Sequence, residues 1–190
     1  MIISAFFAFI LGLAVVLGLL VIFVIAVYNS LIRLRNQVDN AWSQIDVQLK
    51  RRHDLIPNLV ETAKGYMKHE RGTFEAITEA RSKAMGARSV SESSKAEGAL
   101  GEALSKFMLV VENYPDLKAN QNFLSLQEEL SSTENRIAFA RQNYNDQVLS
   151  FNNKIQMFPS NIIAGMFSFG KRDFFEIEAA AEREVPKVSF

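Results

Sequence analysis

An unbroken apolar run occupies residues 2–27, and it is the most distinctive pattern in the chain. The run contains no charged residue and only one polar side chain, Ser4, and 19 of its 26 residues are Leu, Ile, Val or Phe. A helix of this length, at about 1.5 Å per residue, covers the hydrocarbon core of a bilayer, which is about 30 Å thick. We therefore expect residues 1–28 to form a transmembrane anchor.

The flanks of this run separate the anchor from a cleaved secretory signal and suggest an orientation. A signal peptide would begin with basic residues and have a shorter apolar region followed by small residues. Here no Lys or Arg precedes Arg33, whereas Arg35, Lys50, Arg51 and Arg52 follow it. Because basic flanks stay on the cytoplasmic side, we expect the soluble domain to lie in the cytoplasm.

Beyond Tyr28 the apolar residues recur every three or four positions, which predicts helices. The first stripe consists of Leu31, Leu34, Val38, Trp42, Ile45 and Leu49. Asp54 and Pro57 resemble the start of a second helix, because Asp caps helices and Pro fits their first turn. We expect that helix to run to about Met85, followed by a linker at about residues 86–94 and a third helix that closes at residues 113–115.

A longer apolar seam follows, with six residues spaced seven apart. These residues are Phe123, Leu130, Ile137, Tyr144, Phe151 and Phe158. Such a seam requires an apolar partner along about five heptads of helix. No sustained alternation or hairpin turn indicates strands. The sequence therefore predicts an all-α fold, with an up-and-down bundle over residues 29–158 and an irregular, Phe-rich C-terminal tail over residues 159–190.

Three long strings closely resemble the bacterial LemA family. They are YNSLIRLRNQVDNAWSQIDVQLKRRHDLIPNLVETAKGYMKHE, ENYPDLKANQNFLSLQEELSSTENRIAFARQNYNDQVLSFNNKIQMFPSNIIAGMF and RDFFEIEAAAEREVPKVSF. The resemblance implies a four-helix up-and-down core on a membrane anchor in the bacterial cytoplasmic (inner) membrane. It carries over no catalytic residue. One branch of the family is associated with building magnetosome membranes, which implies a part in membrane organisation.

Composition and motifs favour a protein without catalytic chemistry. Lys plus Arg equals Asp plus Glu at 21 each, so no overall field attracts nucleic acid. The chain has no cysteine, and its two histidines, His53 and His69, lie in no metal-ligand spacing. No phosphate loop, nucleophile elbow or dinucleotide fingerprint occurs. We therefore expect neither an enzyme nor a cofactor or metal site.

A polar group on the first helix has two interpretations. Intrahelical ion pairs, such as Asp46 with Lys50, would stabilise the helix by a few tenths of a kcal/mol each. Alternatively, Asp46, Arg52 and Asn58 pair with polar groups on a neighbouring helix and fix register within the bundle or between subunits. For the second interpretation the candidate partners are Glu134, Asn135 and Arg136.

The aromatic tail is the second candidate interaction site. Phe167, Phe169, Phe174 and Phe175 crowd into a short stretch interrupted by glycines. So much aromatic surface is expected to dock on the chain's own bundle, on a neighbouring subunit or at the membrane interface. The leading hypothesis is a scaffold that self-associates on the bilayer as a homo-oligomer. The alternative is an adaptor or binding module for another membrane protein, such as a protease or transporter.

Overall fold

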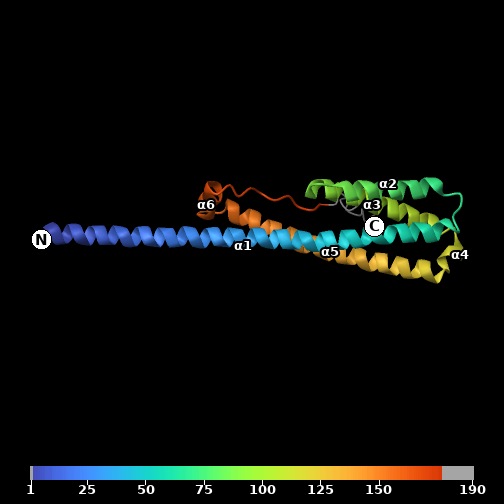
Figure 1. Ribbon diagram of the computed structural model, residues 1–190, viewed down its shortest axis with the longest axis horizontal. Helices are drawn as coiled ribbons and strands as arrows, with labels where there is room; N and C mark the ends of the chain where they lie inside the picture. Colours follow the sequence, from blue (N-terminus) through green and yellow to red (C-terminus); the bar gives the residue numbers. More distant parts are fainter. Residues whose placement is uncertain (1, 177–190) are drawn as a thin grey trace, which may run out of the picture. The chain divides into compact units, whose positions relative to one another are not determined.

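The computed structural model describes residues 2–176, and this part of the chain is helical without strands, as the sequence predicts (Figure 1). The helices are α1 (Ile2–Lys64), α2 (Arg71–Gly86), α3 (Val90–Val111), α4 (Pro115–Lys118), α5 (Gln121–Gln156) and α6 (Ser160–Met166). Contacts divide the chain into two units. Unit 1 comprises Met1–Asn40 with Asp146–Arg172, and unit 2 comprises Ala41–Asn145 with Asp173–Phe190. The part of the tail beyond residue 176 lies outside the described residues.

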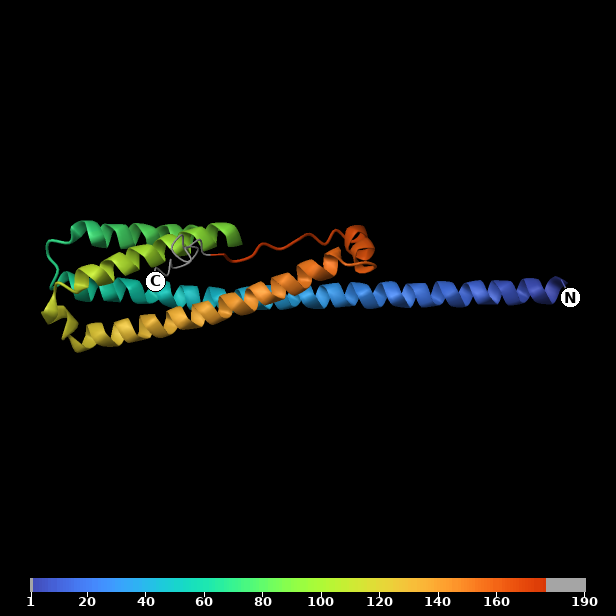
Figure 2. The ribbon, with the colours of Figure 1, turned by 180° about the vertical axis from the view of Figure 1, so that it is seen from behind.

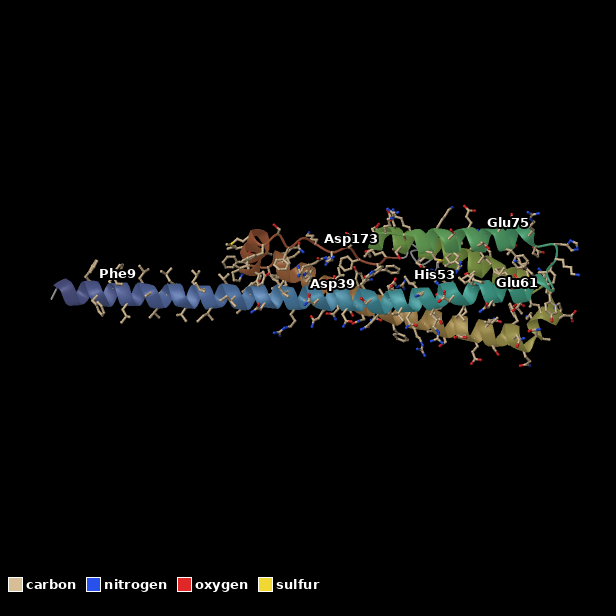
Figure 3. The ribbon with its side chains drawn as sticks, in the orientation of Figure 1. Phe9, Asp39, His53, Glu61, Glu75 and Asp173 are labelled. Atoms are coloured by element: carbon tan, nitrogen blue, oxygen red, sulfur yellow. The ribbon has the colours of Figure 1, made fainter. Side chains whose placement is uncertain are left out.

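The N-terminal part of α1 in unit 1 is uncovered apolar surface. All large apolar side chains between Phe6 and Phe23 are exposed, and Phe9 projects from the helix with no segment beside it (Figure 3). The first buried side chain of α1 is Val27, and Leu31, one turn later, is fully buried. Of the described helices, α1 is the one long and apolar enough to cross a membrane. An apolar surface of this size belongs in lipid, so the chain is membrane-associated.

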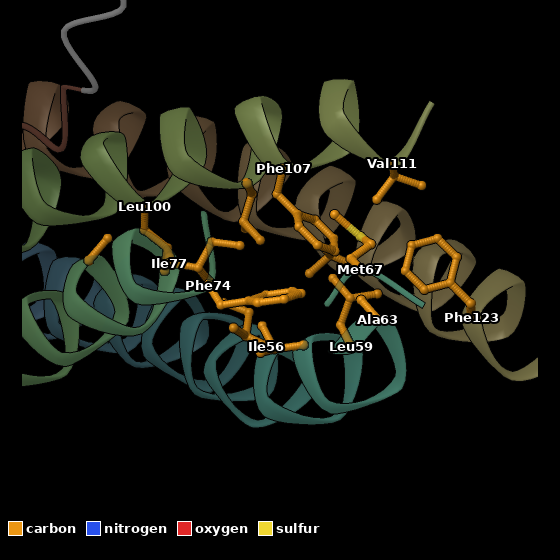
Figure 4. Close-up of a cluster of buried hydrophobic side chains, with 14 of the residues drawn as sticks. Ile56, Leu59, Ala63, Met67, Phe74, Ile77, Leu100, Phe107, Val111 and Phe123 are labelled. Carbon is orange, nitrogen blue, oxygen red and sulfur yellow. The ribbon is translucent and has the colours of Figure 1, made fainter. Parts of the chain in front are cut away.

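Unit 2 is built around one hydrophobic core to which α1, α2, α3, α4 and α5 contribute (Figure 4). The chain reverses direction between α1 and α2, between α2 and α3, and between α3 and α5 (Figures 1 and 2). Aromatic rings link three of these helices: Phe107 of α3 contacts Phe74 of α2 and Phe123 of α5, with ring centroids 6.2 and 6.3 Å apart. Ile56 and Leu59 complete the core from α1. This is the packed domain that the periodicity indicates.

The expected helix start at Asp54 and Pro57 is wrong, because α1 continues through Pro57 to Lys64. Proline has no N–H, so the carbonyl four residues earlier, that of His53, loses its helical partner. The side chain of Arg81 in α2 replaces it, donating from Nε to the His53 oxygen over 2.7 Å. A donor distant in the sequence therefore allows the helix to pass through a proline.

The linker expected at about residues 86–94 is shorter in the structure, where only residues 87–89 separate α2 from α3. Ser89 caps α3 by accepting a hydrogen bond from the Glu92 N–H over 3.1 Å, and the Glu92 carboxylate accepts from the Arg88 N–H over 2.9 Å. This pair resembles a capping box, in which Ser and a Glu three residues later satisfy free N–H groups. The serine-rich stretch after Ser89 is consequently the first turn of a helix.

The apolar seam of α5 is buried from Phe123 to Phe151, but its last member, Phe158, is 78% exposed. Including Phe158 in the seam is wrong, because α5 ends at Gln156 and the chain then turns into α6. A Schellman motif ends α6: the N–H of Phe169 bonds to the Ala164 carbonyl and that of Ser168 to the Gly165 carbonyl, with Ser168 in the left-handed region. The tail is therefore partly helical.

Candidate functional site

A buried ionic network in unit 2 joins α1, α3 and α5. Arg52 is 2% exposed, and its guanidinium bonds the carboxylate of Glu97, which is 1% exposed, and that of Glu134, whose Oε1 lies 2.8 Å from Nη1. His53 approaches Glu97 from the same turn of α1, with 2.8 Å between Nε2 and Oε1. Figure 3 shows His53 on the part of α1 that the other helices cover.

The charges of this network compensate one another within the chain. Burial opposes the charged form of Glu97, but the hydrogen bond from His53 and the positive charge of Arg52 outweigh it and hold the pKa of this carboxyl below its ordinary value. A carboxylate only accepts hydrogen bonds, so His53 Nε2 must be the donor in this pair. Arg52 Nε is buried and has no hydrogen-bond partner. The network thus keeps one unused donor.

Arg81 belongs to the same site, because it bonds the backbone of His53 while the side chain of His53 bonds Glu97. The sequence analysis missed both Glu97 and Arg81. A signal for Glu97 exists: it precedes Leu100 and Leu104 at helical spacing, so a carboxylate stands at a core position of α3. No comparable local signal identifies Arg81, whose role depends on a proline 24 positions earlier.

The predicted partnership of the polar group holds for one of its three members. The structure brings Arg52 to Glu134 on α5, whereas Asp46 and Asn58 have exposed side chains. Nearby, Arg51 reaches Glu129 of α5 over 2.7 Å, but both side chains are about half exposed. Such an exposed pair stabilises the fold by at most about 1 kcal/mol. Of the three residues, Arg52 is therefore the one that links α1 to α5.

Of the grooves on the surface of unit 2, two flank α5. The α3/α5 groove, of about 750 Å³, exposes an edge of the ionic network. Its lining is Arg52, Glu97, Gly98, Gly101, Leu104, Ser105, Met108, Leu109, Gln127, Leu130, Ser131 and Glu134. The α1/α5 groove, of about 650 Å³, is lined by Ser43, Gln44, Val47, Gln48, Arg136, Phe139, Ala140 and Asn143. In the second groove Gln48 Oε1 is buried without a hydrogen-bond partner.

In unit 1 the first two tail phenylalanines pack on the end of the membrane run. The rings of Phe167 and Phe169 have centroids 4.7 and 5.9 Å from that of Tyr28, and Phe169 also contacts Phe151. The amide of Asn152 binds the backbone of Arg172 twice, with both distances 2.9 Å. The Asn152 side chain thus replaces the two hydrogen bonds that an extended backbone segment would make to a neighbouring strand in a sheet. The sequence analysis did not single out Asn152.

In unit 2 the adjacent tail residues Phe174 and Phe175 have opposite environments. Phe175 is fully buried beside Trp42 and Tyr144, with the ring of Trp42 5.7 Å away, whereas Phe174 is 37% exposed. Asn145 bonds the N–H and the carbonyl of Phe175 as Asn152 does those of Arg172. Phe175 is therefore part of the chain's own fold. Among the tail phenylalanines up to residue 176, Phe167 and Phe174 keep exposed surface for a partner.

Within residues 2–176 no group of three or more His, Cys, Asp or Glu side chains is placed to hold a metal ion. The network of Arg52, His53, Glu97 and Glu134 is suited to fixing the register of three helices, because it places hydrogen-bonded charges of both signs between them. The grooves on either side of α5 offer mixed apolar and amide surface. Such surface is suited to a protein partner.

Comparison with known proteins assigns the chain to a family. Residues 41–190 match the sequence profile of the LemA family. Protein LemA of Metamycoplasma hominis is 30% identical over 184 residues, covering 96% of this chain and 81% of that protein. Magnetosome protein MamQ 2 of Paramagnetospirillum magneticum is 24% identical, and magnetosome protein MamQ of Magnetospirillum gryphiswaldense 22%, each covering 83% of this chain and 68% of the relative. The resemblance seen in the residues is confirmed, and the chain belongs to the LemA family.

Proposed function

We propose that this protein is a non-enzymatic scaffold of the bacterial inner membrane that self-associates through the α1/α5 groove. The observation that carries the proposal is the exposure of Phe139, 74%, beside a concave surface in a packed domain. A large aromatic side chain left in water at the edge of a hollow is typical of a binding surface. Val47, across the groove on α1, is exposed as well.

The groove has the chemistry to bind a second copy of itself. A two-fold interface places the same patch on both sides, so the Phe139 of each copy can enter the groove of the other. The amides of Gln44, Gln48 and Asn143 both donate and accept hydrogen bonds, so they complement their own copies. The one charged residue in the lining is Arg136, and Asp46, exposed next to Val47, supplies the opposite charge.

The membrane anchor compensates for the small contact area of the α1/α5 groove. Eight lining residues offer less than the roughly 800 Å² per partner of a standard stable interface. Two copies held in one bilayer meet at a raised effective concentration, which strengthens weak contacts without new surface. An assembly on the membrane is therefore favoured over one in solution.

The test is the size of the full-length protein in mild detergent, measured by light scattering after gel filtration. We expect an oligomer, and Phe139→Ser should reduce its mass. Leu109→Ser is the matched control, because Leu109 is similarly exposed in unit 2 but lies on α3, away from this groove. A wild-type protein that is monomeric both in detergent and, by cross-linking, in vesicles would overturn the scaffold proposal.

An adaptor for another membrane protein is the second candidate, and the α3/α5 groove favours it. Gly101 has open space where a side chain would begin, which leaves room for a partner helix to approach closely, and Leu109 adds exposed apolar surface at that groove. A protein that stays monomeric at the membrane supports this candidate. Leu109→Ser would then weaken binding of the partner, and Phe139→Ser would not.

The orientation is part of the proposal and has its own test. Arg33 and Arg35 follow the membrane run, so the soluble domain is proposed to face the cytoplasm. Arg88 is exposed, and the chain has no cysteine, so Arg88→Cys introduces a single accessible thiol. Membrane-impermeant thiol reagents should label it in broken cells but not in intact ones. Labelling in intact cells would reverse the orientation.

A further inference from the structure

Five large apolar side chains form an exposed patch around α6 in unit 1. This α6 patch consists of Met157, Phe158, Ile162, Met166 and Phe167. Each is about half exposed or more, although the same short segment buries Ile163 and Ala164 against its own unit. Two sides of α6 are thus apolar. One side packs on its own unit, and the other is uncovered. A water-facing helix would carry polar residues there.

The α6 patch lies beside the end of the membrane run. Phe167 packs on Tyr28, the first residue after that run, with ring centroids 4.7 Å apart, and both views show α6 next to α1 (Figures 1 and 2). The chain begins to cover its own helix at Val27, one residue before Tyr28. Through Phe167, the α6 patch therefore lies next to the end of the uncovered anchor surface.

The level of Tyr28 in a bilayer follows from the length of the run. If residues 2–27 are centred in the membrane, half of a ~30 Å core takes about ten residues of helix. The hydrocarbon boundary then falls near residue 25, and Tyr28 lies about one turn beyond it, in the headgroup layer where Tyr is enriched. A segment that packs directly on Tyr28 is held at the same level.

The charges around this level are mainly positive. Residues 28–40 and 146–172 carry five basic side chains and two acidic ones, Asp39 and Asp146. The basic residues are Arg33, Arg35, Lys154, Lys171 and Arg172. Arg172 is paired with Asp39 over 2.9 Å, and Arg35 lies over the ring of Phe169. An apolar patch with basic residues at its border matches the chemistry of a lipid surface with anionic headgroups.

We propose that α6 and the turns on either side of it are seated in the membrane–water interface, with the α6 patch inserted among lipids next to the anchor. The occupant of this surface is the bilayer, because the patch continues the apolar surface of a membrane helix. Phe158 is the most exposed of the five side chains in the α6 patch, so it enters the lipid. The chain then holds its membrane by two contacts, a spanning helix and a shallow wedge. This proposal is independent of self-association.

The absence of cysteine allows a direct test with single-cysteine variants of the full-length chain. Phe158→Cys and, separately, Phe139→Cys are labelled with the polarity-sensitive dye NBD and reconstituted in vesicles of phosphatidylcholine and phosphatidylglycerol. Phe139 is the matched control, because it has nearly the same exposure, 74% against 78%, but lies on α5 in unit 2. The readout is quenching of NBD by lipids that carry a nitroxide near the headgroup.

We expect these lipids to reduce the NBD emission at position 158 by about twofold and to leave that at position 139 nearly unchanged, because collisional quenching requires lipid contact. Ile162→Cys should behave as Phe158→Cys does. Equal, weak quenching at positions 158 and 139 would overturn the proposal. A blue-shifted emission at position 158 without lipid quenching would overturn it too, because a protein partner would then cover the α6 patch. Helical content by circular dichroism verifies that each variant is folded.

Discussion

The ionic network of unit 2 and the α6 patch of unit 1 are opposite departures from the ordinary distribution of residues. In the network, Arg52 and Glu97, which prefer water, are almost fully removed from it. In the α6 patch, Phe158 and Met166, which avoid water, are left exposed. Both arrangements would be costly in isolation. The difference is where the compensation comes from.

The network is compensated inside the chain, and the patch is not. In the network, the four side chains of Arg52, His53, Glu97 and Glu134 satisfy most of one another's hydrogen bonds. The network therefore needs no partner outside the chain. The described residues provide nothing that covers Phe158. Mutations in the network should therefore affect stability, and mutations in the patch should affect only what the protein does with its surroundings.

The largest expected effect is the loss of Arg52. Arg52→Ala removes the ion pairs with Glu97 and Glu134 and leaves the Glu97 carboxylate buried with only His53, which should lower the free energy of unfolding by about 3–5 kcal/mol. Urea unfolding in mild detergent, followed by circular dichroism, measures it. Arg88→Ala, at an exposed position, is the control and should change stability by less than about 0.5 kcal/mol. Equal effects would show that the network does not hold the fold together.

The adjacent pair Phe174 and Phe175 tests whether the tail is part of the fold in unit 2. Phe175→Ala empties a site beside Trp42 and should cost about 3 kcal/mol, the lower end of the range for buried Phe, because Trp42 is only half-buried and can shift toward the gap. Phe174→Ala should cost less than about 1 kcal/mol. Calorimetric melting of both variants is the measurement. A larger loss for Phe174 than for Phe175 would contradict the packing described here.

A smaller effect is expected for Arg81, and it should depend on Pro57. Arg81→Ala leaves the His53 carbonyl without a donor and should cost about 1–3 kcal/mol. In a Pro57→Ala background the new N–H at position 57 supplies that donor, so the same Arg81→Ala change should cost clearly less. A double-mutant cycle of unfolding free energies measures the coupling. Additive costs would mean that Arg81 acts on stability in some other way.

The smallest effect is expected in the α6 patch. Phe158→Ser should change the free energy of unfolding in detergent by less than about 0.5 kcal/mol, because the ring contributes little to the protein's own packing. The readout is the same urea titration that is used for Arg52→Ala. A loss comparable to that of Phe175→Ala would place Phe158 in the core and remove the contrast between the two regions.

Local patterns identify the features of this protein that depend on neighbouring residues in the sequence. The apolar run at residues 2–27 predicts the membrane helix, because its length and composition alone satisfy a bilayer. Spacing of three or four predicts the helices, and spacing of seven predicts the buried seam from Phe123 to Phe151. The resemblance to the LemA family rests on the same local strings.

Tertiary structure decides the features that depend on a partner far along the chain. Pro57 does not end α1, because Arg81 replaces the missing hydrogen bond. Phe175 is buried and Phe174 is exposed, although the two are adjacent. The amide of Asn145 bonds the N–H and the carbonyl of Phe175 and so holds that residue against the core. Arg52 is buried because Glu97, 45 residues away, meets it. Whether a charge is compensated or an aromatic ring is covered is a property of the whole packed domain, so the sequence determines the elements here and the tertiary contacts determine which side chains remain available for function.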